Sequence, residues 1–139
     1  KFHPGGSLGS KLTIKIEDVM FGRNDLPLVV ENTSMREAMS VLSKKNLGII
    51  ISIDDKGKIK GVFTTGDLMR LIEDGRSFLE KPLYEFAKPN PKTIDPMELA
   101  AKGLYLMEKH SITCLIVSDQ ENNPIGVVQI YYILRAGVY

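Results

Sequence analysis

Residues 61–67 read GVFTTGD, and residues 126–132 read GVVQIYY. The two stretches start 65 positions apart, and the same shift aligns the sequence on either side of them. For example, the apolar run Ile49–Ile51 falls on Cys114–Ile116. An internal repeat of this length indicates two structural units that share one architecture.

The repeat also aligns two amphipathic helices. Apolar residues recur at i, i+3, i+4 and i+7, which is the spacing of a helix face that packs on a core. A capping pattern precedes each helix, at Ser34–Glu37 in the first copy and at Asp95–Glu98 in the second. The two apolar faces consist of Met35, Ala38, Met39 and Leu42 in the first copy, and of Ala100, Gly103, Leu104 and Met107 in the second.

Extended segments and a short closing helix surround each long helix, so each copy is predicted to be β-α-β-β-α. A unit of about 60 residues buries too little apolar surface to be stable alone. The predicted fold class is therefore α+β, with two repeats packed by their sheets with pseudo-twofold symmetry. The predicted strands are 27–30, 47–53 and 59–63, followed by a helix at 67–73, and 92–95, 112–117 and 125–128, followed by a helix at 131–135.

The composition excludes several classes of protein. Eighteen basic and seventeen acidic residues among 139 give a net charge of +1 without a basic stripe, so we expect no nucleic acid partner. No apolar stretch approaches the roughly 20 residues of a membrane span, so we expect no membrane partner. Two distant histidines and one cysteine, Cys114, supply no metal-ligand cluster, and a lone thiol fits the reducing cytoplasm.

Two β-α-β-β-α units of this size, each with a Gly-hydrophobic-hydrophobic signature at its last strand, resemble a CBS-domain pair. The ligand motif of that family, Gly-h-x-Thr-x-x-Asp, is complete in residues 61–67. The resemblance assigns residues 13–75 to a first CBS motif and residues 76–139 to a second. Residues 1–12 would be the tail of a preceding sugar isomerase (SIS) domain and a linker.

The ends of the chain narrow the resemblance. Residues 3–9 (HPGGSLG) and residues 134–138 (LRAGV) are similar to bacterial D-arabinose 5-phosphate isomerases. This implies a missing isomerase domain that interconverts ribulose 5-phosphate and arabinose 5-phosphate for synthesis of the lipopolysaccharide sugar Kdo. His3 would be a catalytic proton-transfer residue of that domain. The chain alone is expected to be inactive, because the partners of His3 are absent.

Thr64 and Asp67 are the candidate ligand contacts. A strand ends and a helix begins between them, so unpaired backbone N–H groups can hold a phosphate there. Thr64 adds a hydroxyl donor, whereas Asp67 would repel phosphate and is suited to accept hydrogen bonds from a ribose diol. Thr-x-x-Asp is also a capping pattern that needs no ligand.

By resemblance to other CBS pairs, segments of the second copy would complete the pocket. Lys88 and Lys92 either neutralise a phosphate or are solvated loop lysines. Cys114 is expected to be a small core residue rather than a reactive thiol. The full set of expected ligand-binding residues is Gly61, Thr64, Thr65, Gly66, Asp67, Ala87, Lys88, Lys92, Ile112, Thr113 and Cys114.

The second copy departs from the motif. Gln129 and Tyr132 stand where the first copy has Thr64 and Asp67. Because the carboxylate is missing, the equivalent site is expected to be empty or to bind something else. Tyr131 and Tyr132 are expected to pack, or to contact another subunit, rather than to stack on a base.

Two hypotheses on function remain. In the first, the chain is a regulatory module without a required cofactor. It would sense AMP or ATP, or a pathway product such as CMP-Kdo, and pass that state to its isomerase domain. In the second, the pair is a ligand-free scaffold that holds an isomerase tetramer together. Both include a homodimer through the short helices, which are apolar on more than one face.

Overall fold

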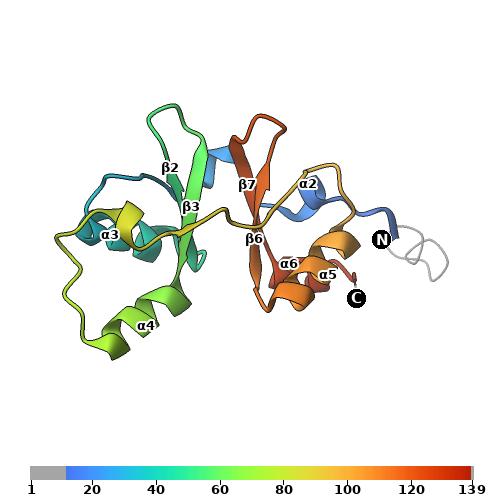
Figure 1. Cartoon of the computed structure of the whole chain (residues 1–139). Helices are drawn as coiled ribbons and strands as arrows, with labels where there is room; N and C mark the ends of the chain where they lie inside the picture. The colour runs from blue at the N-terminus through green and yellow to red at the C-terminus, as the bar shows by residue number, and fades with distance from the viewer. Residues whose placement is uncertain (1–11, 139) are drawn as a thin grey trace. The chain divides into compact units, whose positions relative to one another are not determined.

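The computed structural model describes residues 12–138. They form two compact units, each of which contains one copy of the repeat (Figure 1). The first-repeat unit comprises residues 25–91 and 121–124, and the second-repeat unit comprises residues 12–24, 92–120 and 125–138. Each unit has its own sheet and its own hydrophobic core.

The first-repeat unit is built on a four-stranded sheet of order β1-β2-β3-β4. Strand β1 is parallel to β2, and the other neighbouring pairs are antiparallel. The elements are η1 (Arg23–Asp25), β1 (Leu28–Val30), α3 (Met35–Lys45), β2 (Ile49–Ile53), β3 (Ile59–Thr64), α4 (Thr65–Asp74), η2 (Leu83–Glu85) and β4 (Lys88–Pro89).

The second-repeat unit has a three-stranded sheet of order β5-β6-β7, in which β5 is parallel to β6. Its elements are α2 (Ile16–Val19), β5 (Thr93–Ile94), α5 (Ala100–His110), β6 (Cys114–Ser118), β7 (Pro124–Gln129) and α6 (Ile130–Arg135). Both copies thus have the predicted β-α-β-β-α order, and the predicted α+β fold with two repeats is confirmed.

Of the two long helices, α3 begins with the predicted side-chain cap, whereas α5 has no side-chain cap. Ser34 caps α3, because its Oγ accepts a hydrogen bond from the N–H of Glu37 at 3.2 Å. The prediction that Asp95 caps the second long helix is wrong, since α5 starts after Leu99, which has no capping side chain. Asp95 holds a turn instead, where its Oδ1 accepts a hydrogen bond from the N–H of Met97 at 2.8 Å.

The long helices turn their predicted apolar faces to the cores. The face of α3 is buried except for Met39, which is half-buried, and the face of α5 is buried at all four positions. Phe63 and Leu83 are among the buried residues of the first core, and Leu115 and Ile133 of the second. Burial of this apolar surface is the main term that stabilises each unit.

The segment before the first repeat packs on the second repeat. Ile16 is fully buried in the second core, and its N–H donates to the carbonyl of Glu98 at 2.9 Å. Gly103 on α5 makes room for it, since a Cβ there would lie 2.9 Å from Cδ1 of Ile16. The compact units therefore divide the chain differently from the sequence repeat, whose boundaries at 13–75 and 76–139 remain predictions.

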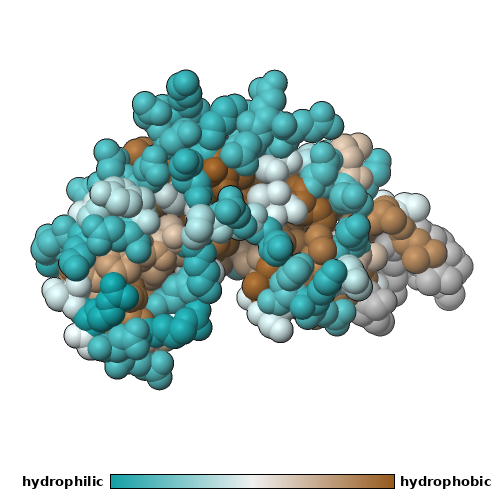
Figure 2. Space-filling view, viewed as in Figure 1, coloured by the Kyte–Doolittle hydropathy of each residue, from teal (hydrophilic) through white to brown (hydrophobic). Residues whose placement is uncertain are grey.

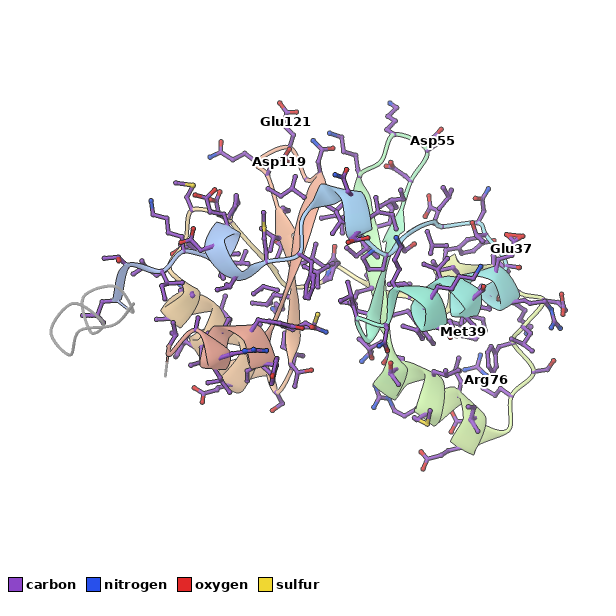
Figure 3. The ribbon with its side chains drawn as sticks, turned by 180° about the vertical axis from the view of Figure 1, so that it is seen from behind. Glu37, Met39, Asp55, Arg76, Asp119 and Glu121 are labelled. Atoms are coloured by element: carbon purple, nitrogen blue, oxygen red, sulfur yellow. The ribbon has the colours of Figure 1, made fainter. Side chains whose placement is uncertain are left out.

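Residues 121–124 join the first-repeat unit through the hairpin between β2 and β3. The N–H of Ile59 donates to the carbonyl of Asn122 at 3.1 Å, and Nδ2 of Asn122 donates to the carbonyl of Ile59 at 3.1 Å. Nζ of Lys58 donates to the carbonyl of Glu121 and to Oδ1 of Asn123. Figure 3 shows Glu121 at the tip of the hairpin between β6 and β7. Four hydrogen bonds therefore hold this tip against the start of β3.

Helix α4 has both a hydrophilic and an apolar exposed surface. Glu73 and Asp74 are exposed at its C-terminal end, which is hydrophilic on the face drawn in Figure 2. Met69 and Ile72 are nevertheless 51% and 58% exposed.

No helix within residues 12–138 is both long and apolar enough to cross a bilayer.

Candidate functional site

The junction between β3 and α4 is the candidate site, and Gly61 allows its parts to meet. Gly61 pairs with Pro89 of β4. A Cβ at position 61 would lie 2.8 Å from the carbonyl oxygen of Lys88 and 3.2 Å from the Cβ of Ala87. Because glycine has no side chain, β4 can approach β3 closely, and Lys88 reaches the start of α4.

Thr64 and Asp67 form a reciprocal capping box at the start of α4. The N–H of Asp67 donates to Oγ1 of Thr64 at 3.2 Å, and the N–H of Thr64 donates to Oδ2 of Asp67 at 2.9 Å. Thr64 and Asp67 therefore form the helix cap that their sequence pattern predicted as the alternative to a ligand contact. Asp67 is also buried, with 7% exposure, which a cap at the surface of a helix does not require.

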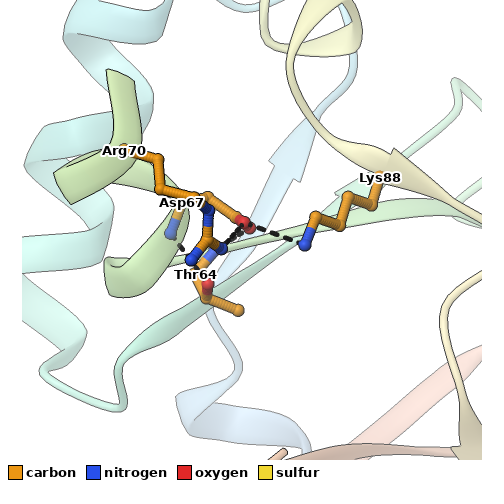
Figure 4. A network of polar contacts seen from close by, with 4 residues as sticks. All are labelled: Thr64, Asp67, Arg70 and Lys88. Carbon is orange, nitrogen blue, oxygen red and sulfur yellow. Dashed lines mark hydrogen bonds and ion pairs between the residues drawn. The ribbon is translucent and has the colours of Figure 1, made fainter. Parts of the chain in front are cut away.

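Two cations contact the other carboxylate oxygen of Asp67 (Figure 4). Nη2 of Arg70 lies 2.6 Å from Oδ1, and Nζ of Lys88 lies 3.1 Å from the same atom. The side chains of Arg70 and Lys88 are 61% and 64% exposed, whereas that of Asp67 is 8% exposed. Sequence reasoning missed Arg70, although a position three residues after Asp67 on a helix is favourable for an ion pair.

These neighbours keep Asp67 ionised. Burial by itself would raise the pKa of the carboxyl group. Hydrogen bonds from the N–H of Thr64, from Arg70 and from Lys88 outweigh burial, so the pKa of Asp67 is lowered from its ordinary value of 3.8. One carboxylate and two cations leave the cluster with a net positive charge that faces solvent. The arrangement favours an anion as ligand.

The last strand of the second-repeat unit meets its neighbouring segment in the same way. Gly126 aligns with Gly61, and a Cβ there would lie 2.5 Å from Sδ of Met20 and 2.9 Å from the carbonyl oxygen of Phe21. Phe21 forms an antiparallel bridge to Val127 of β7, and Lys88 pairs in the same way with Val62 of β3, which is the residue that aligns with Val127. Phe21 therefore occupies the position of Lys88.

Aromatic rings replace the charged cluster at this equivalent site. Tyr132, which aligns with Asp67, packs edge-on against Phe21 with 5.1 Å between ring centroids. It packs in the same manner against Tyr131 at 5.0 Å. Gln129, the N-cap residue of α6, makes no capping hydrogen bond with its side chain. The second copy has thus lost the carboxylate, the cap and the lysine together.

A comparison with known protein families assigns the repeat. The model of the CBS domain matches residues 16–74 and 83–139. The chain belongs to the CBS domain family. The charged cluster therefore lies in the first CBS domain, and the aromatic cluster lies in the second.

Curated relatives of this CBS pair are arabinose 5-phosphate isomerases. The chain is 38% identical over 136 residues to arabinose 5-phosphate isomerase KdsD of Pseudomonas aeruginosa, across 98% of this chain and 42% of that relative. It is 35% identical over 136 residues to KdsD of Escherichia coli strain K12, across 98% of this chain and 41% of that relative. The chain thus spans about two fifths of the length of these relatives.

Solved CBS structures share the fold. CBSX2, crystallised in complex with AMP, has a TM-score of 0.78 and 23% identity, covering 88% of this chain and 95% of its own. The CBS domain pair of protein MJ0100, in complex with 5′-methylthioadenosine and S-adenosyl-L-methionine, has a TM-score of 0.79 and 23% identity. That match covers 88% of this chain and 94% of the MJ0100 chain. At these identities the likeness concerns the fold.

The structure brings together only part of the predicted site. Gly61, Thr64, Asp67, Ala87 and Lys88 meet in the first-repeat unit. Thr65 and Gly66 lie at the same junction and are exposed on the first turn of α4, whereas Lys92, Ile112, Thr113 and Cys114 belong to the second-repeat unit. The roles of all these residues as ligand contacts remain predictions, and His3 lies outside the described residues.

The thiol of Cys114 is half-buried, and its pKa is raised. Burial raises the pKa of its thiol to about 12, so the group stays protonated at neutral pH. Cys114 is half-buried and is not among the buried residues of the second core, so its role as a core residue remains a prediction. Among residues 12–138, no group of three or more His, Cys, Asp or Glu side chains is arranged to hold a metal ion.

A cavity of about 530 Å³ opens elsewhere in the first-repeat unit. It is lined by Val30, Glu31, Asn32, Asp55 and Tyr84. None of the predicted ligand residues lines it. Its two carboxylates make it a poor site for a phosphate, in contrast to the cluster at Asp67.

Proposed function

We propose that this CBS pair is a regulatory module that binds an adenine nucleotide such as AMP or ATP. The observation that carries the proposal is the buried carboxylate of Asp67, held at a strand–helix junction beneath Arg70 and Lys88. Acidic side chains accept hydrogen bonds from ribose hydroxyls in dinucleotide-binding folds. Helix N-termini and exposed cations attract phosphate. The shared fold with CBSX2, solved in complex with AMP, supports the same ligand class.

The module would regulate an attached arabinose 5-phosphate isomerase domain. The KdsD relatives are more than twice as long as the matched segment. The additional part would interconvert ribulose 5-phosphate and arabinose 5-phosphate for synthesis of Kdo, and His3 would belong to its catalytic site. The 139-residue chain by itself is expected to convert no ribulose 5-phosphate. A coupled assay that detected conversion by the purified chain would contradict this assignment.

A thermal-shift panel of AMP, ATP, S-adenosylmethionine and CMP-Kdo tests the ligand class. A ligand that binds only the folded chain raises the unfolding midpoint. We expect AMP or ATP to raise it. A shift with CMP-Kdo alone would preserve a regulatory role but replace the ligand with a pathway product. Unchanged midpoints with all four compounds would contradict the proposal.

Two alanine variants locate the nucleotide by calorimetry. Asp67→Ala removes the charged acceptor of the ribose, so AMP affinity is expected to fall about tenfold to hundredfold. Tyr132→Ala changes the equivalent position of the second repeat and is expected to leave AMP affinity nearly unchanged. Equal losses in the two variants, or two nucleotides per chain, would show that the second repeat binds nucleotide as well.

A ligand-free oligomerisation scaffold is the second candidate function. Two observations favour it: Asp67 has hydrogen-bond partners within the protein, and α4 exposes Met69 and Ile72. Under this alternative neither alanine variant changes any ligand response, and the chain associates without nucleotide. The same thermal-shift panel, combined with light scattering, separates the two functions.

A further inference from the structure

Asp67 has little free capacity to bind a ribose. An ionised carboxylate has about four acceptor positions. Oδ2 accepts one hydrogen bond from the N–H of Thr64, and Oδ1 is shared by Arg70 and Lys88. A single position is left, whereas a diol that donates both hydroxyls needs two. A ribose can therefore bind Asp67 through both hydroxyls only when Arg70 or Lys88 leaves Oδ1.

The two cations can leave, because they are exposed and the carboxylate is not. Their side chains are 61% and 64% exposed, against 8% for that of Asp67. The guanidinium of Arg70 lies over the first turn of α4, 3.6 Å from the position that a Cβ of Gly66 would take. The N–H groups of Thr65 and Asp67 already donate to the carbonyl of Gly48 and to Oγ1 of Thr64, so the dipole of α4 rather than these N–H groups favours an anion in the same place. A phosphate bound at this turn is therefore within reach of the displaced cation.

We infer that the ion pairs of Arg70 and Lys88 with Asp67 act as an electrostatic latch, because they keep a ribose diol off the carboxylate until a phosphate draws one cation away. This latch makes the site select phosphorylated nucleosides over nucleosides. This inference rests on the proposed nucleotide function. A nucleotide that opens the latch replaces the broken ion pair, since its phosphate becomes the new partner of the released cation. A nucleoside breaks the same ion pair and supplies no anion. Arg70 and Lys88 thus determine specificity in addition to contacting phosphate.

Titrations of the 139-residue chain with AMP and with adenosine test the latch, using calorimetry for tight binding and NMR for weak binding. The variants are Arg70→Met and, as a matched surface control, Arg36→Met, whose native arginine pairs with Glu80. The wild-type chain is expected to prefer AMP by at least about tenfold. Arg70→Met should weaken AMP binding and strengthen adenosine binding, because one competitor for Oδ1 is gone. Arg36→Met should change neither affinity.

The direction of the change for adenosine decides the result. Unchanged or weaker adenosine binding to Arg70→Met would mean that Arg70 only contacts phosphate or supports the fold, and the latch would be overturned while nucleotide binding stood. Wild-type chain that bound neither compound would overturn the nucleotide function and the latch together. Lys88→Met repeats the test from β4, so the outcome does not depend on the folding of one variant.

Discussion

Asp67 links the charge of a single residue to the stability of the whole fold. Its pKa is lowered in the folded chain, so its contribution is complete above the ordinary value of 3.8 and is lost as the pH falls through the lower folded pKa. Asp67→Asn keeps the shape but removes the charge, and is expected to lower the free energy of unfolding by about 1–3 kcal/mol near neutral pH. Urea unfolding should show this difference shrinking in acid. A difference of constant size at both pH values would rule out the ionised carboxylate as its cause.

At the scale of a residue, Gly61 also determines how closely β4 approaches β3, because it has no side chain. In Gly61→Ala the new Cβ would meet the carbonyl of Lys88 at 2.8 Å, so β4 must move away from β3. The expected cost is about 1–3 kcal/mol, together with a weaker contact between Lys88 and Asp67. Gly22→Ala is the matched control, because a Cβ there has no neighbour within 4 Å. Equal stabilities of the two variants in chemical denaturation would count against this role.

At the scale of elements, Asn122 holds the tip of one hairpin against the start of β3. Its φ is +65°, a left-handed conformation, and both its amide and its carbonyl bond Ile59. Asn122→Ala loses the amide and keeps the unfavourable φ, which costs about 1–2 kcal/mol in conformation alone. Asn122→Gly loses the amide but tolerates the φ. Thermal unfolding should therefore rank wild type above the glycine variant and the alanine variant last. An alanine variant as stable as the glycine variant would contradict the strain argument.

At the scale of the whole molecule, the exposed apolar surface of α4 predicts self-association. Ile72 is 58% exposed and Met69 is 51% exposed on the same helix, and such residues favour a second packing partner. We expect a dimer at tens of micromolar, a rough working range for weak association. Ile72→Asp should shift sedimentation toward monomer, whereas Glu73→Gln on the same helix should not. A wild-type chain that sediments as a monomer would refute the prediction.

The sequence by itself determined the repeat, the β-α-β-β-α order, and the buried faces of α3 and α5. It also located the motif at residues 61–67 and its loss at residues 126–132. These features are local or periodic, because burial of one helix face imposes the same spacing on any helix that packs on a sheet. The cap of α3 was equally local, since Ser34 and Glu37 lie one turn apart.

Only the tertiary structure decided which distant segments meet. It placed Lys88 and Arg70 on one oxygen of Asp67, Phe21 against Tyr132, and Ile16 in the core of the second repeat. It also moved the start of α5 past Asp95, which holds a turn. Sequence patterns report the secondary-structure propensity and the burial of a single segment. The contacts of Lys88 and Phe21 depend instead on which distant segment covers the edge of β3 or β7. That choice follows from close backbone approach at Gly61 and Gly126, which no periodicity encodes.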